Sequence, residues 1–352
     1  MRIALLVALV GFGCGGKSAQ APDGATIDGT LLDATALDGA TQSVVLPLGT
    51  VSGVTATACP SGLPTGAVCS TLTVVCPGVP NLQAQVAITQ PSTTLKGTAV
   101  LHFGGGGTTF FDEGFPAGYL AAGLRVVQMR WATEWPASPG GSIKAAACRP
   151  ATVIQWAFDN AHAASRSLGF CVQGHSGGSG ALGYALAHYG LGSIIDYAME
   201  DAGPVFGRID YGCEPSLSGQ SGTTRYICPL QPNGPFAYSA AASALDRWET
   251  TSTCGAPYGD SSAADRSRWA ADSVVSPGAT FAYPKTEVSF WYCANNSNEA
   301  TGQGAYMVDE VTTTKSVNCI AGGCQTEPYW SDPQGKQTMI SAMGTSCVPH
   351  HQ

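Results

Sequence analysis

Short runs of apolar and β-branched residues alternate along the chain with stretches whose apolar positions recur at helical spacing. Runs typical of strands span residues 71–75, 83–89, 98–103, 124–129, 169–173, 194–199, 288–292 and 316–320. Helical patterns span residues 151–165, 180–189 and 335–343. Alternation of strands and helices predicts a mostly parallel sheet with helices on both faces, in an α/β domain over residues 46–352.

One interval, residues 207–283, lacks this alternation of strand and helix patterns and is rich in Ser, Gly, Pro and Cys. We interpret it as an inserted cap held by disulfides among three of its cysteines, Cys213, Cys228 and Cys254. Its aromatic side chains are expected to shape a substrate pocket; they include Tyr226, Phe236, Tyr238 and Trp248.

The first 45 residues differ from the rest. Met1-Arg2 and the apolar run Ile3 to Val10 are typical of an export signal, and the stretch is too short to span a bilayer. A small residue directly precedes Cys14, which resembles a lipoprotein signal in which Cys14 carries the lipid, although Gly11 stands where such signals usually have Leu. Residues 15–45 are small and polar, so we interpret them as a flexible tether. The alternative is ordinary cleavage and secretion.

Charge and cysteine content narrow the possible partners. The net charge of -8 argues against nucleic acid, whose binding depends on Lys and Arg. Of the 13 cysteines, 13 - 1 = 12 remain after Cys14, an even number that favours structural disulfides in an oxidising compartment. No cysteines and histidines show metal-site spacing, and the sequence implies no metal and no cofactor. Membrane contact is expected through a lipid anchor alone.

The sequence Gly174-His175-Ser176-Gly177-Gly178 follows an apolar strand and opens a helix of small residues. A serine on such a turn exposes its hydroxyl, and the flanking glycines let strand and helix approach closely. The N–H of Gly177 then points from the start of a helix toward a reacting oxygen.

About 70 residues earlier, His102-Phe103-Gly104-Gly105-Gly106-Gly107 follows another strand. Together the two motifs resemble the nucleophile turn and the His-Gly-Gly-Gly loop of serine esterases and lipases in the α/β-hydrolase family, over residues 70–350. The resemblance implies the α/β-hydrolase fold with a cap insertion, Ser176 as nucleophile, and an oxyanion hole formed by the N–H groups of Gly105, Gly106 and Gly177.

The resemblance also implies a histidine that follows the nucleophile and the acid along the chain. His188 lies on the helix after the turn and is expected to point away, which leaves His350 and His351. Because the loop after the last strand contains no histidine, we predict that a Cys324–Cys347 disulfide folds the tail back toward Ser176.

Two carboxylates are candidates for the acid that orients this histidine. Asp201 lies in Met199-Glu200-Asp201-Ala202-Gly203-Pro204, which is similar to the acid turn of some lipases. Glu299 is the carboxylate that follows the strand 288–292 and is the alternative. The sequence therefore predicts an exported enzyme that cleaves carboxylic esters through an acyl-enzyme on Ser176. A noncatalytic surface-anchored binding protein and a serine peptidase on the same scaffold are the alternatives.

Overall fold

The structure, a computed structural model, describes residues 44–112, 114–138, 142–213, 228, 263–293, 299–320 and 333–352. The signal segment with Cys14, almost all of the tether, and Cys254, Cys324 and the four cap aromatics lie outside these residues. Among the described residues, no helix is both long and apolar enough to cross a membrane.

Nine strands form a single sheet in the order β1-β2-β3-β5-β4-β6-β7-β8-β9. Their bounds are β1 Thr50–Thr57, β2 Val68–Val75, β3 Leu82–Thr89, β4 Gly97–His102, β5 Leu124–Trp131, β6 Gly169–His175, β7 Tyr197–Asp201, β8 Glu287–Cys293 and β9 Lys315–Ile320. The first three strands pair antiparallel, as does β3 with β5, and all pairs from β5 to β9 are parallel. The predicted mostly parallel sheet is confirmed, and every predicted strand is present. The sequence interpretation missed the edge strand β1.

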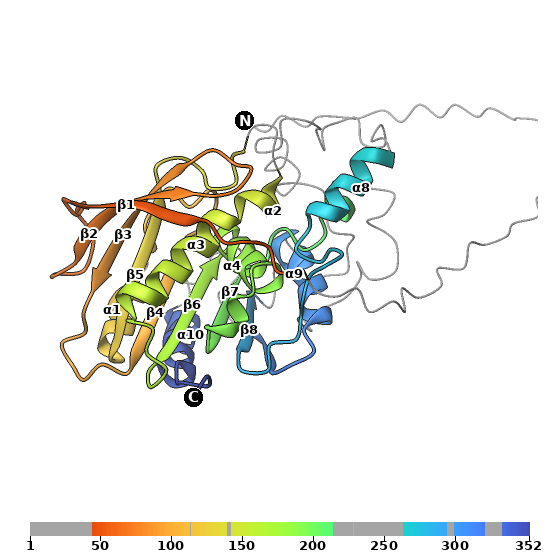
Figure 1. The fold of residues 1–352 in the computed structure, drawn as a ribbon. Helices are drawn as coiled ribbons and strands as arrows, with labels where there is room; N and C mark the ends of the chain where they lie inside the picture. The colour runs from red at the N-terminus through yellow and green to blue at the C-terminus, as the bar shows by residue number, and fades with distance from the viewer. Residues whose placement is uncertain are drawn as a thin grey trace, which may run out of the picture. The chain divides into compact units, whose positions relative to one another are not determined.

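Helices cover both faces of the sheet (Figure 1). They are α1 Phe115–Ala121, α2 Ile143–Ala146, α3 Cys148–Trp156, α4 Gly177–Ala187, α5 Ile209–Cys213, α8 Ala263–Asp272, α9 Glu299–Glu310 and α10 Pro333–Ser346, with a π-helical turn η1 Ala157–Ala161 and a 3-10 turn η2 Leu191–Ser193. The buried residues of α3, α4 and α9 join one core cluster, and those of α1 and α10 join a second cluster on the other face. Burial of these two apolar clusters is the main force that holds the layers together.

Four disulfides join described cysteines: Cys59–Cys69, Cys76–Cys148, Cys171–Cys347 and Cys228–Cys319. The prediction of structural disulfides is thus confirmed, and such bonds are typical of proteins in oxidising compartments. Two predicted pairings are wrong. Cys228 bonds to Cys319 of β9 rather than to a cysteine of the cap, and Cys347 bonds to Cys171 of β6 rather than to Cys324.

Candidate active site

The candidate site lies where parallel strands end. Because β4, β6 and β7 run in the same direction, their carboxyl ends meet at one edge of the sheet. His102 is in register with Gly174, and His175 is in register with Asp201. The segments that follow these strands, including the glycine loop and the turn at Ser176, therefore come together there.

The backbone of Ser176 is strained. Its φ of 49° and ψ of -112° lie outside the regions that L-residues prefer, which costs about 1–3 kcal/mol. The Ser176 N–H donates to the carbonyl of Asp201, and the Ser176 carbonyl accepts from Gly180 in the first turn of α4. These bonds hold the backbone of the turn between β6 and α4.

Glycines allow the close approach that this turn requires. An added Cβ on Gly174 would lie 2.3 Å from the carbonyl oxygen of Gly178, and an added Cβ on Gly177 would lie 2.0 Å from the carbonyl oxygen of Gly105. A side chain at either position would push the strand from the helix or the glycine loop from the turn. The loop and the turn are therefore packed backbone against backbone.

Residues 104–107 form a tight turn in which the N–H of Gly107 donates to the carbonyl of Gly104. That bond does not use the N–H groups of Gly105 and Gly106. Gly105 is exposed, has a φ of +59°, and lies beside Gly177, the first residue of α4. Gly106 is buried against Glu134 and accepts from the N–H of Trp135. The structure thus brings Gly105 and Gly177 together, with Gly106 one residue farther along the loop.

Asp201 is fully buried and lies beside His175. The distance from Asp201 Oδ2 to His175 Nδ1 is 3.3 Å, and Gln173 Nε2 donates to the same oxygen at 3.4 Å. Gln173 in turn accepts a hydrogen bond from the hydroxyl of Tyr119 at 2.5 Å. Burial, together with the nearby Tyr197 and Asp201, raises the pKa of Tyr119, so this hydroxyl keeps its proton. A buried polar network therefore holds the carboxylate against the imidazole.

His175 also faces the glycine loop. An added Cβ on Gly104 would lie 2.9 Å from His175 Cδ2 and 3.2 Å from Ser176 Cβ. Cδ2 of His175 and Cβ of Ser176 therefore both lie close to Gly104 of the loop. The rings of Phe103 and Phe111 pack around the imidazole, with centroids 5.7 and 6.3 Å away.

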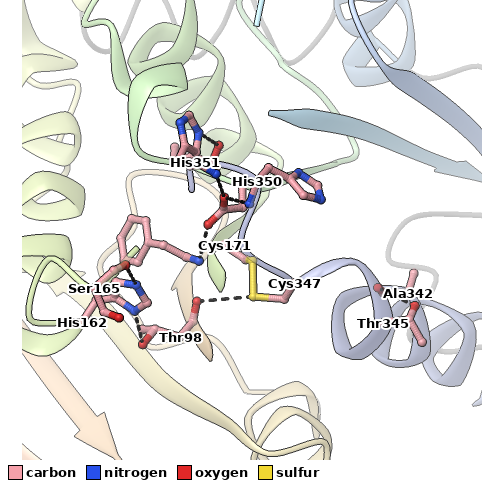
Figure 2. The surroundings of a disulfide bond; sticks show 12 residues. Thr98, His162, Ser165, Cys171, Ala342, Thr345, Cys347, His350 and His351 are labelled. Atoms are coloured by element: carbon pink, nitrogen blue, oxygen red, sulfur yellow. Dashed lines mark hydrogen bonds between the residues drawn. A yellow bond between two sulfur atoms is a disulfide. The ribbon is translucent and has the colours of Figure 1, made fainter. Parts of the chain in front are cut away.

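The tail histidines lie at the opposite end of the sheet. The N–H groups of His350 and His351 both donate to Oδ1 of Asp196, the residue that precedes β7, and Phe170 near the start of β6 donates to Oδ2 of the same carboxylate. Figure 2 shows both histidines beyond the Cys171–Cys347 disulfide, which fastens the end of α10 to β6. Ser176 is six residues farther along than Phe170, which is about 20 Å at 3.3 Å per residue.

The structure therefore does not bring His350 or His351, the predicted partners of Ser176, to the end of β6 that carries this serine. The disulfide does fold the tail back onto the sheet, but its partner Cys171 lies in the first half of β6 rather than at the end that carries Ser176. Glu299, the alternative acid, begins α9, and its side chain lies outside what the structure describes.

The remaining histidines have structural partners. His188 contacts the carbonyl of Val274, and His162 contacts Thr98 and Ser165. His102 is buried and its Nε2 accepts from the indole of Trp131 at 3.1 Å. Burial lowers the pKa of His102 to about 3, so this imidazole is neutral near pH 7. Among all six histidines, His175 is thus the one that adjoins both Ser176 and a buried carboxylate.

The sequence interpretation set His175 aside because the family order places the histidine after the acid. The register of β6 and β7 was the available signal, since it aligns His175 with Asp201. The interpretation also missed the link between Ser179 of α4 and Glu200 of β7, in which the hydroxyl donates to the carboxyl group. Burial raises the pKa of Glu200 well above its ordinary value. Because Glu200 and Asp201 point to opposite faces of the sheet, they take part in separate contacts.

Comparison with solved structures identifies the fold. Acetyl xylan esterase 1 from Thermoanaerobacterium sp. JW/SL YS485 superposes with a TM-score of 0.50 and 11% sequence identity, over 82% of this chain and 87% of that chain. The chain has the α/β-hydrolase fold. Hydrolases of this fold carry their nucleophile on a turn between a strand and a helix, and Ser176 lies on such a turn between β6 and α4.

Other solved structures are similar at lower scores. Brefeldin A esterase, a bacterial homologue of human hormone sensitive lipase, has a TM-score of 0.48 and 16% identity, over 84% of this chain and 81% of that chain. A bacterial heroin esterase has a TM-score of 0.48 and 14% identity, over 82% and 87% of the two chains. Searches of protein-family models and of curated proteins found no match.

Proposed function

We propose that the protein is an exported serine hydrolase that cleaves carboxylic esters through an acyl-enzyme on Ser176. The strained backbone of Ser176, between a buried strand and a helix and pressed against a glycine loop, carries this proposal. Strain of about 1–3 kcal/mol persists where the surrounding structure enforces it, and such positions cluster at active sites. The esterases that share the fold support the choice of ester as substrate.

In the proposed reaction Ser176 Oγ attacks the ester carbonyl while Nε2 of His175 takes its proton. Asp201, whose Oδ2 lies 3.3 Å from Nδ1 of His175, stabilises the imidazolium that forms. The N–H groups of Gly105 and Gly177 hold the oxyanion. His175 then gives its proton to the departing alcohol, and water, deprotonated by the same imidazole, releases the carboxylic acid from Ser176.

Ester and amide turnover test this function against the peptidase alternative. We expect the oxidised protein to release 4-nitrophenol from 4-nitrophenyl acetate well above the rate of buffer. We expect no release of 4-nitroaniline from peptide anilides under the same conditions. Faster turnover of the anilides would favour a peptidase, and no turnover of either by folded protein would contradict the proposal.

Gly177 and Gly105 provide a matched test of the oxyanion hole. Gly177→Ala is expected to lower kcat about 10²- to 10³-fold, because its Cβ would lie 2.0 Å from the Gly105 carbonyl oxygen and displace a donor. At Gly105 a Cβ would meet nothing within 4 Å, so Gly105→Ala is expected to cost about 1–2 kcal/mol of stability for its positive φ and to change kcat much less. Steady-state kinetics of both variants measure the change in kcat, and thermal unfolding measures the change in stability. Equal losses of kcat would contradict the assignment.

The noncatalytic alternative is favoured by one observation. The loop after β9, where the family usually places its histidine, has none, and the tail histidines lie about 20 Å away along β6. A noncatalytic protein with this fold would bind ligands at this edge of the sheet without hydrolysing them.

A further inference from the structure

A groove of about 420 Å³ opens on the sheet beside the glycine loop. Thr71, Gln85 and Arg130 line it and form one row across three strands, because Thr71 is in register with Gln85 and Gln85 with Arg130. Side chains in such a row point to the same face. Their neighbours Leu72 and Ala84 point to the other face, into the core. The groove therefore has a polar floor built from the sheet itself.

Arg130 is held in place within this groove. Its Nε donates to Gln85 Oε1 at 2.9 Å, and Gln85 Nε2 donates to Thr57 Oγ1 at 3.1 Å. The guanidinium carbon lies 5.0 Å from the centre of the Phe110 ring. An amide holds one edge of this guanidinium and a ring packs on one of its faces. The side chain therefore loses little further conformational freedom when a ligand binds its remaining edge.

The charge of Arg130 has no carboxylate partner among the described residues, where its guanidinium donates to the amide of Gln85. The chain has 24 acidic and 16 basic residues, so acidic side chains are not scarce. The two terminal amino groups of a guanidinium match the two oxygens of a carboxylate. A half-buried, positioned and unpaired guanidinium is thus a site for a carboxylate from outside the chain.

The groove adjoins the candidate active site through one short segment. Phe110 packs on Arg130, and the next residue, Phe111, packs on His175 with ring centroids 6.3 Å apart. Thr108, which also lines the groove, directly follows the glycine loop. Two adjacent residues, Phe110 and Phe111, therefore connect Arg130 with His175.

We propose that this groove binds a free carboxylate of the substrate, so that the preferred substrates are esters that also carry an acidic group. The proposal rests on the proposed ester hydrolysis at Ser176 and names its substrate class. Gln83 and Thr71 add amide and hydroxyl groups that can bind other oxygens near the carboxylate.

The test compares two esters of similar size, mono-4-nitrophenyl glutarate and 4-nitrophenyl pentanoate. Arg130→Gln is expected to lower kcat/KM for the glutarate ester about 10- to 100-fold, since a charge-assisted bidentate pair is lost, and to leave the pentanoate ester within about twofold. Arg166→Gln is the matched control, because Arg166 also lies over a ring, that of Phe158, on a segment before β6. It is expected to change neither rate. An equal effect of Arg130→Gln on both esters, or no effect on either, would overturn the proposal.

Binding separates this proposal from the hydrolytic one. Glutarate is titrated by calorimetry into Ser176→Ala and into the double variant Ser176→Ala/Arg130→Gln. We expect binding to the first, weakened by salt, and at least tenfold weaker binding to the second. If neither ester is hydrolysed but glutarate binds through Arg130, the proposed function fails and the groove assignment stands. If both esters are hydrolysed and glutarate binds neither variant, the groove assignment fails alone.

Discussion

Replacing Ser176 by alanine is expected to lower kcat for ester hydrolysis by about 10⁴- to 10⁶-fold, because no other hydroxyl stands on the turn between β6 and α4. The rate acceleration that remains in this variant comes from the oxyanion donors and from substrate binding. Steady-state kinetics with 4-nitrophenyl acetate measure the loss.

Two further serine variants separate chemistry from stability. Ser176→Gly is expected to abolish turnover as well, but to raise the free energy of unfolding by about 1 kcal/mol, because glycine adopts a φ of 49° without strain. Ser179→Ala, three residues farther along the same helix, is expected to show the opposite pattern. It leaves Glu200 without its hydroxyl donor and costs about 1–3 kcal/mol, while kcat stays within about threefold. Loss of stability in Ser176→Gly would contradict the interpretation of the backbone as strained.

His175→Ala is expected to lower kcat about 10²- to 10⁴-fold, the usual contribution of a positioned general base. The double variant His350→Ala/His351→Ala is expected to retain kcat within about twofold, because both histidines contact Asp196 at the far end of the sheet. Added imidazole should restore part of the activity of His175→Ala. If instead the tail variant loses activity and His175→Ala keeps it, the assignment of His175 is wrong.

Most of the sheet could be predicted because its strands are buried. β4 and β6 are buried along their whole length. Their sequences are therefore short, mostly apolar runs, which are typical of buried strands. β1 was missed because it is an edge strand with mostly exposed residues, including Gly53 and Val54, and carries no clear alternation. α1 was missed because it is a single short helix of seven residues that begins at Phe115 with Pro116 in its first turn.

The turn that carries Ser176 could be predicted from local sequence, because strand, turn and helix are contiguous in the chain. The side chains that lie near this turn could not be predicted in the same way, because their positions depend on contacts between distant segments. Cys171 and Cys347 are 176 residues apart, and no spacing rule connects them. Because Cys347 bonds to Cys171, the tail reaches the first half of β6. His175 was visible in the sequence, but its pairing with Asp201 required the register of two neighbouring strands.

The most direct measurement of the central claim is covalent labelling with a fluorophosphonate, which reacts with an activated serine. We predict that the folded, oxidised protein gains one adduct per chain, that peptide mapping places it on Ser176, and that it is absent from Ser176→Ala. Folded protein that takes up no label, or a label on another serine that persists in Ser176→Ala, would contradict the account.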